Sequence, residues 1–172
     1  MRGRSIAGRQ SAWVIAMSPG LFGISLPAGA AVPATSAVGP GGYTVYVLNA
    51  DSDTVTPIST ASDKAGPAIP VGDNPQGIAI TPNGKTVYVV NGGAGTVTPI
   101  STATDTAGPA IPVGTTPDAI AITPDGKTAY VPNVFSNSVT PISTATDRAG
   151  IPIAVGSEPE QIVIGPLRQD IG

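Results

Sequence analysis

The sequence predicts an all-β fold built from copies of one four-stranded unit. The motif Tyr-Val-x-Asn starts at Tyr46, Tyr88 and Tyr130, which are spaced 42 residues apart. Residues 75–116 and 117–158, aligned at that spacing, share 26 of 42 positions. The chain also contains 22 glycines and 19 prolines, which divide it into short runs of β-branched residues. Short strands in a tandem repeat of about 40 residues are typical of the blades of a β-propeller.

Four strand-like runs make up each copy, and turn residues separate them. Between the first two runs, Pro82-Asn83-Gly84 places proline where φ of about −65° is needed and glycine where φ must be positive, which predicts a tight hairpin. These two runs are almost continuously apolar, as expected of strands that neighbouring blades cover on both faces. In the central copy the predicted strands are 76–81, 86–90, 96–101 and 110–113.

Prolines weaken the outer half of each unit. Pro57, Pro99 and Pro141 fall inside the third run, where each removes one backbone donor from the ladder. We therefore expect sparse pairing between the third and fourth runs. Pro70 and Pro112 lie in the fourth run and suit an outermost strand that is protected against edge-to-edge aggregation.

The repeats are too few to close a propeller within this chain. Residues 43–166 hold three copies of the last three strands, whereas propellers close with about four to eight blades. Two outcomes follow from this count. Either the last run of one chain completes the first blade of a second chain, giving a six-bladed dimer, or the chain is a truncated, non-functional propeller fragment.

The segments that flank the repeats bear on this choice. Residues 31–42 are either a linker or a degraded first strand, because Ser36 stands where the next copy has Ile78. A last copy of the first strand is expected at 160–164, and 167–172 form a C-terminal tail.

The N-terminus has the three-part layout of a secretory signal peptide, which we assign to residues 1–30. Three arginines precede an apolar stretch at 12–26, and small residues follow at 27–31. Cleavage after Ala30 would remove these arginines and no acid, which takes the net charge from −3 to −6. We therefore expect a secreted or cell-surface protein with no membrane span after cleavage and no nucleic-acid partner.

Cysteine and histidine are both absent from the chain. Their absence excludes disulfides, thiolate or histidine metal sites and a Ser-His-Asp triad built from this chain alone. An enzyme is therefore the less favoured class, and no cofactor is expected apart from a calcium ion.

The ordered motifs Tyr-Val-x-Asn, Thr-Val, Ile-Pro-Val-Gly and Pro-x-x-Ile-Ala-Ile-Thr-Pro-Asp-Gly-Lys closely resemble the YVTN family of β-propeller repeats. The resemblance covers roughly residues 43–166. It departs from the family in the proline of the third strand and in Ser59, Ser101 and Ser143, where such repeats commonly carry aspartate. The resemblance implies an exported or surface-layer propeller of bacteria or archaea, related to lactonase-like propellers, and it transfers no catalytic residue.

The resemblance also implies that the loops between strands two and three share one rim with the loops between blades. The loops of that rim carry acids and no lysine or arginine, whereas aspartates balance Lys64, Lys85, Lys127 and Arg148 on the other rim. We call the first rim the acidic rim, and its predicted binding residues are Asp51, Asp53, Asp73, Asp118, Phe135, Glu158 and Glu160.

One short segment of this rim resembles a calcium loop. Asn49, Asp51 and Asp53 place oxygen atoms at alternate positions, although later copies do not keep the two aspartates. A polar turn explains the same residues, and the repeated Asn49, Asn91 and Asn133 are expected to form turns and not to bind metal. The three motif tyrosines are expected to be core residues with a satisfied hydroxyl.

These observations favour an exported scaffold that binds a protein, a glycan or a cation at the acidic rim. The alternative is a lactonase-like, metal-dependent hydrolase in which carboxylates and amides hold a metal that activates water. No convergent ligand set for such a metal is visible in the sequence.

Overall fold

The computed structural model describes residues 13–15, 25–27 and 42–166, and the chain falls into two units, 1–41 and 42–172. In the first unit, β1 (Trp13–Ile15) pairs with β2 (Ser25–Pro27) in an antiparallel ladder. The cleavage position of the predicted signal peptide and nearly all of the 31–42 segment lie outside the described residues, as does the tail at 167–172.

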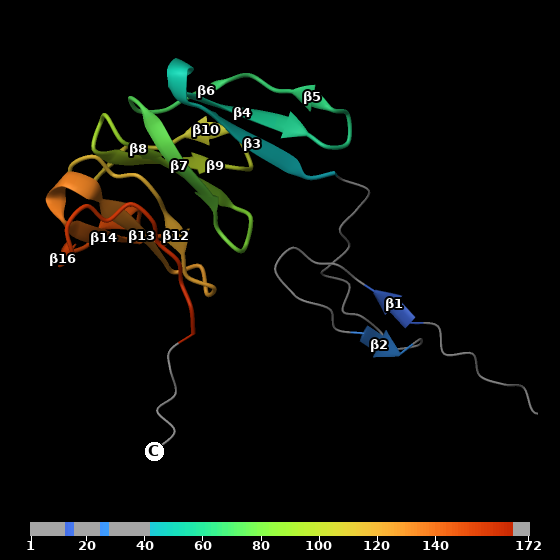
Figure 1. Cartoon of the computed structure of the whole chain (residues 1–172). Coiled ribbons are helices and arrows are strands. Elements are labelled where there is room, and N and C mark those ends of the chain that lie inside the picture. Colours follow the sequence, from blue (N-terminus) through green and yellow to red (C-terminus); the bar gives the residue numbers. More distant parts are fainter. Residues whose placement is uncertain (1–12, 16–24, 28–41, 167–172) are drawn as a thin grey trace, which may run out of the picture. The chain divides into compact units, whose positions relative to one another are not determined.

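The second unit consists of three antiparallel sheets, one for each repeat (Figure 1). The first sheet contains β3 (Thr44–Asn49), β4 (Thr54–Ser59), β5 (Lys64–Ala65) and β6 (Ile69–Pro70). The second contains β7 (Pro75–Ile80), β8 (Thr86–Asn91), β9 (Thr96–Ser101), β10 (Thr106–Ala107) and β11 (Ile111–Pro112). The third contains β12 (Ala121–Ile122), β13 (Thr128–Asn133), β14 (Ser138–Ser143), β15 (Arg148–Ala149) and β16 (Ile153–Ala154).

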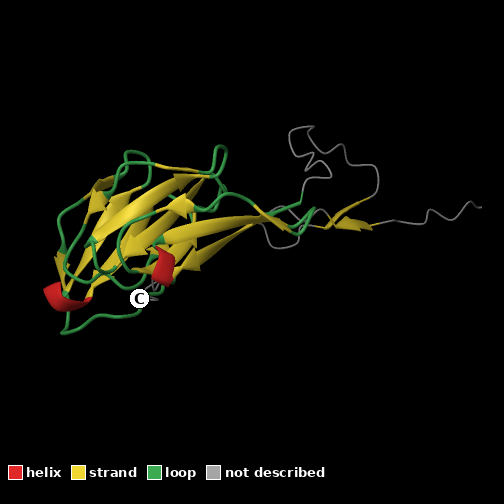
Figure 2. Ribbon diagram, turned by 90° about the horizontal axis from the view of Figure 1, so that it is seen from above, coloured by secondary structure: helices red, strands yellow, loops and turns green. Residues whose placement is uncertain are grey.

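Helix is confined, in the described part of the chain, to two short 3₁₀ turns, η1 (Ala50–Ser52) and η2 (Val134–Ser136). They occupy corresponding loops of the first and third sheets and are drawn in red in Figure 2. Neither is long and apolar enough to cross a membrane. The prediction of an all-β fold with four-stranded antiparallel units is confirmed.

The outer strand of each sheet is split in two. In the second sheet, β10 and β11 both pair with β9, and the register shifts by one residue between them. The break lies opposite Pro99, whose carbonyl accepts a hydrogen bond from the Gly108 amide at 2.7 Å but which has no N–H to donate. The expected sparse pairing is therefore present. The outer strand differs from the predicted 110–113 because it starts earlier, at Thr106, and is interrupted.

The predicted hairpin turn is also present. The Gly84 amide donates to the Thr81 carbonyl at 2.8 Å, and Gly84 has a φ of 70°. The Asn83 side chain accepts hydrogen bonds from the Thr81 hydroxyl and from the Lys85 amide. In the third repeat Asp125 takes the place of Asn83 and makes the corresponding two bonds.

The core consists of two apolar clusters, one between each pair of neighbouring sheets. β8 contributes to both, because its side chains alternate between its two faces. Val87 and Val89 face the first sheet, whereas Tyr88 and Val90 face the third. Full burial of each such side chain contributes roughly 1.5–3 kcal/mol. Coverage on both faces explains why this run of the sequence is continuously apolar.

The two ends of the array lack this coverage. No strand lies beside β3 on its outer side in the described residues, so Val45 and Val47 are 47% and 38% exposed. Their counterparts in the second repeat, Val87 and Val89, are 1% and 0% exposed. At the other end, the run predicted as a strand at 160–164 forms none. A strand needs a partner for its backbone groups, and this run has no second-strand neighbour among the described residues.

Candidate functional site

Two sets of loops meet at the acidic rim between the first and second sheets. The Asp53 carboxylate accepts a hydrogen bond from the Asn74 amide at 2.9 Å. The Asn74 carbonyl then accepts one from the Gly92 amide at 2.8 Å, and the Asp73 carbonyl accepts one from Gly93 at 3.2 Å. The loop between strands two and three of each sheet is thus joined to the loop that connects the sheets.

The same arrangement recurs between the second and third sheets. The Val134 amide donates to the Thr116 carbonyl at 3.0 Å, and the Thr115 amide donates to the Ser136 hydroxyl at 2.8 Å. On the opposite rim, the Thr102 hydroxyl donates to the Gly84 carbonyl at 2.7 Å. The two classes of loop therefore segregate to opposite ends of the sheets, and the predicted acidic residues lie in or directly after loops of one end.

The acids of this rim differ in how freely they face solvent. Asp53 and Asp118 are half-buried, and the Asp53 carboxylate already accepts a hydrogen bond from the Asn74 amide. The remaining four are exposed, and they are Asp51, Asp73, Glu158 and Glu160. No lysine or arginine occurs in the described loops of this rim, so the local potential is negative.

In the segment that resembles a calcium loop, two of the three side chains are engaged in hydrogen bonds with other protein groups. The Asn49 side-chain amide donates to the hydroxyls of Thr54 and Thr56 at 3.2 and 2.8 Å, and the Asp53 carboxylate caps Asn74. Asp51 lies in η1 and is exposed. Nowhere in residues 13–15, 25–27 and 42–166 do three acidic side chains converge as a metal-binding group.

The repeated asparagines have a structural role that the sequence reading missed. Buried Asn91 accepts a hydrogen bond from the Gly72 amide at 3.2 Å and donates to the hydroxyls of Thr96 and Thr98 at 3.0 and 2.9 Å. Asn133 holds the Gly114 amide in the same way. The asparagine therefore ties the end of the second strand to the connection from the preceding sheet. The sequence features that could have revealed this role are the recurring Val-Gly and Thr-x-Thr motifs, whose residues bind the asparagine side chain.

Two of the motif tyrosines also bind the next sheet. The Tyr46 hydroxyl donates to the Asp105 carboxylate at 2.7 Å, and that of Tyr88 donates to Asp147. Burial, reinforced by these hydrogen bonds, raises the pKa of both tyrosines well above the ordinary value. The expected satisfied hydroxyl is present at both. The corresponding tyrosine of the third sheet, Tyr130, has no hydrogen-bond partner for its hydroxyl among the described residues.

A polar cavity of about 570 Å³ opens on the acidic rim between the second and third sheets. Ser136 lines it, and the next residue toward the N-terminus, Phe135, is 69% exposed. The other lining residues are small, and they are Gly92, Gly93, Ala94, Gly95, Val113, Gly114, Thr115 and Thr116. A cavity lined by small residues, with an exposed phenylalanine directly before Ser136 in the chain, marks this part of the rim as the candidate site.

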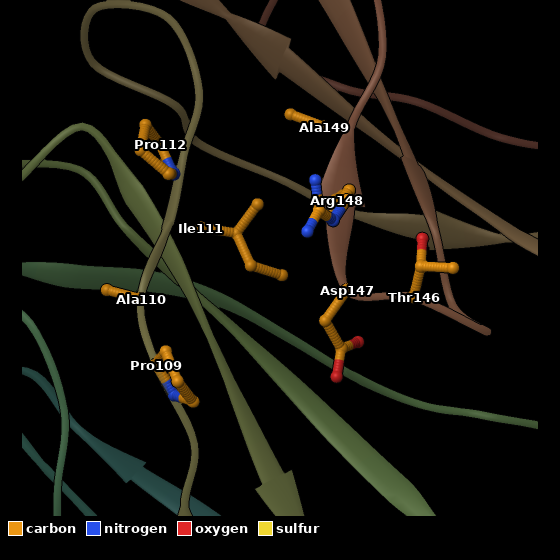
Figure 3. A pocket seen from close by; sticks show the side chains of 8 residues that line it. All are labelled: Pro109, Ala110, Ile111, Pro112, Thr146, Asp147, Arg148 and Ala149. Atoms are coloured by element: carbon orange, nitrogen blue, oxygen red, sulfur yellow. The ribbon is translucent and has the colours of Figure 1, made fainter.

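A second kind of cavity lies between the outer strands of neighbouring sheets. Figure 3 shows the one of about 650 Å³ between the β11 region and the turn before β15, with Ile111 on one wall and Asp147 and Arg148 on the other. A copy of about 420 Å³ lies one repeat earlier. The Asp147 carboxylate already accepts a hydrogen bond from the Tyr88 hydroxyl of the preceding sheet. We therefore interpret this crevice as a consequence of how neighbouring repeats pack, and not as a binding site.

Comparison with known proteins supports the fold without naming a family. No family model matches the chain, and no curated protein matches it either. Among solved structures, hydrazine synthase from Kuenenia stuttgartiensis is similar at 29% identity with a TM-score of 0.65, over 69% of this chain and 34% of that one. The chain is all-β and consists of β-propeller blades. Three blades in one chain make an incomplete propeller.

Two further solved structures agree with this fold. Apo AztD from Citrobacter koseri has 17% identity and a TM-score of 0.58, over 70% of this chain and 34% of its own. The dihydro-heme d1 dehydrogenase NirN has 17% identity and a TM-score of 0.59, over 64% of this chain and 24% of its own. The chain thus spans about a third or less of these proteins. The resemblance to the YVTN family in particular stays a prediction.

Proposed function

We propose that the chain is an exported binding module that presents its acidic rim to a basic protein surface. The observation that carries this proposal is Phe135, which is 69% exposed and directly precedes Ser136, a residue that lines the polar cavity of the rim. Large aromatic side chains that stay exposed on a surface are typical anchors of protein interfaces. Four exposed acids on the same rim supply the complementary charge.

A protein partner is favoured over a cation or a glycan by the form of the site. A cation needs several oxygen ligands around one point, and the rim acids are spread over the loops of successive blades. The rim combines an apolar anchor with dispersed negative charge, which matches a surface that carries lysine or arginine around an apolar side chain. Export rests on the signal-like N-terminus.

The proposal is tested by measuring the binding of a fluorescent lysine-rich peptide that carries one leucine to the full chain by anisotropy. Replacing Asp51, Asp73 and Asp118 together with lysine is expected to weaken binding by roughly 100-fold or more, because three attractive charges become repulsive. Phe135→Ala is expected to weaken it by roughly 10-fold through loss of the anchor. Binding should also fall as the salt concentration rises.

A matched control separates the rim from net charge. Asp73→Asn and Asp125→Asn change the net charge equally, and Asn83 shows that asparagine makes the same turn contacts as Asp125. Asp73→Asn should weaken binding whereas Asp125→Asn should not. Equal effects of the two variants, or unchanged binding in the triple variant, would contradict the proposal. Binding of a neutral oligosaccharide or of Ca²⁺ in place of the peptide would also overturn it.

A further inference from the structure

We infer that two copies of this chain close one six-bladed propeller, in which residues 159–164 of each copy form the missing inner strand of the other copy's first blade. The inference starts from the two uncovered ends of the blade array. At one end β3 has a free edge, and at the other end a run related to β7 has no strand to pair with. Within the described residues, the first blade lacks an inner strand, and the run after the last blade has the sequence of such a strand but lacks a partner.

The uncovered faces correspond to the two faces that already pack inside the chain. Val45 and Val47 of the first blade stand one repeat before Val87 and Val89, which are buried against the preceding blade. On the last blade, Tyr130, Val139, Ile153 and Val155 stand one repeat after residues that face the following blade, namely Tyr88, Val97, Ile111 and Val113. A second copy placed one repeat beyond the last blade would therefore reproduce an interface that occurs twice within the chain.

Unused hydrogen-bonding groups at the two ends match in pairs. Tyr46 and Tyr88 bind Asp105 and Asp147 of the next blade, and one repeat on, Tyr130 would bind Asp63 of the second copy. Neither the Tyr130 hydroxyl nor the Asp63 carboxylate has a hydrogen-bond partner among the described residues. The contact would thus satisfy both groups without displacing any bond that exists now.

The repeated asparagine supplies a second matched pair. Asn91 accepts from Gly72, and Asn133 accepts from Gly114, each across the junction between two blades. One repeat on, Gly156 would donate to the side-chain oxygen of Asn49 of the second copy. Added Cβ atoms at Gly72 and Gly114 would lie 2.7 and 2.6 Å from the asparagine, whereas one at Gly156 meets nothing within 4 Å. The space that an asparagine fills at the other two junctions is open at the third.

The run at 159–164 suits the vacant strand better than the segment before β3. Ile78 of β7 packs into the apolar cluster between the first and second blades. Its counterpart two repeats on is Ile162, whereas its counterpart one repeat earlier is Ser36. The segment before β3 therefore lacks the apolar side chain that this cluster contains.

The number of copies follows from the number of blades. Head-to-tail contacts close into a ring only when the blades complete a full turn, and propellers close with about four to eight blades. A chain that contributes three blades meets this range only as a pair. The register of β7 on β8 then predicts the strand pairs across each junction: Ile162 with Val47 of the second copy, Val163 with its Tyr46, and Ile164 with its Val45.

The inference is tested first by the mass of the full chain in solution. A dimer is expected, and a stable monomer or an open series of larger species would overturn the inference. Tyr130→Phe and Asp63→Asn are each expected to raise the dissociation constant of the dimer by about 10- to 100-fold, since each ring contains two such bonds. Tyr43→Phe is the control, because Tyr43 is exposed outside the junction pairs, and it should leave the constant unchanged.

Disulfide trapping tests the register. The chain has no cysteine, so a mixture of Val47→Cys chains and Ile162→Cys chains can join only at the introduced residues. Directly opposed residues in antiparallel strands have Cβ atoms about 4.5–5.5 Å apart, close enough for a disulfide to form with a small adjustment. The mixture should oxidise to a covalent heterodimer, whereas Val47→Cys with Val163→Cys should not, because Val163 points to the other face of the strand. Equal yields from the two mixtures, or none from the first, would overturn the inference.

Discussion

Replacing Asn91 with alanine is expected to destabilise the blades more than any exposed asparagine replacement. Asn91 is fully buried, and its side chain makes three hydrogen bonds, to the Gly72 amide and to the hydroxyls of Thr96 and Thr98. Alanine makes none of them. The half-buried Gly72 amide would then lose its side-chain partner at the junction between the blades.

The size of the effect follows from these contacts. Each buried hydrogen bond contributes about 1 kcal/mol, and an unsatisfied buried amide costs about 1–3 kcal/mol. Rotation of the two threonine hydroxyls recovers part of the loss, which leaves about 2–4 kcal/mol for Asn91→Ala. Total stabilities of domains are about 5–15 kcal/mol, so this is a large fraction.

Urea unfolding of the full chain, followed by circular dichroism, measures the effect. With a slope of about 2 kcal/mol per molar urea, the midpoint should fall by about 1–2 M. Asn83→Ala is the matched comparison, because Asn83 also accepts two hydrogen bonds but lies in an exposed turn. Water replaces those bonds, so the expected loss there is about 1 kcal/mol or less.

The comparison decides whether burial at the blade junction matters. If Asn83→Ala destabilises as much as Asn91→Ala, or if Asn91→Ala costs less than about 1 kcal/mol, the asparagine does not lock the junction and the reasoning is wrong.

Two further predictions concern the same junctions. Gly114→Ala should destabilise the chain by about 1–3 kcal/mol, because the added Cβ would overlap Asn133, whereas Gly156→Ala should leave a monomeric chain unchanged. Equal unfolding midpoints for the two variants, measured at a protein concentration low enough to keep the chain monomeric, would refute the overlap. The contribution of Tyr46 and Tyr88 to stability should be fully present below pH of about 10 and be lost at higher pH, since their raised pKa values mean that the unfolded chain loses these protons first. Alkaline unfolding of Tyr46→Phe with Tyr88→Phe measures this, and a slope as steep as that of the unchanged chain would count against it.

Much of the fold could be read from local sequence. The hairpin turn at Pro82-Asn83-Gly84 depends on the backbone preferences of these residues alone, and it forms as predicted. The break in the outer strand follows from the missing N–H of Pro99 and is also local. The period of 42 residues then carries both features from one blade to the next.

The candidate site was only partly predictable. The asymmetric charge of the two rims was predicted from the acids and bases of the sequence together with the rim geometry that the family resemblance implies. The cavity that Ser136 lines was not visible, since its walls come from loops of two neighbouring blades. The contribution of Asn91 was also missed, because its partner Gly72 lies 19 residues away across a junction.

The sequence by itself determined the repeating unit and its strands and turns. These properties depend on residues within a few positions of one another. Only the tertiary structure decided which polar groups are satisfied across the junctions and which remain open at the two ends. Hydrogen bonds between blades require both partners to be placed in three dimensions, and the last run at 160–164 shows the consequence. It has the sequence of a strand but no neighbour in the described chain, and so it does not form one.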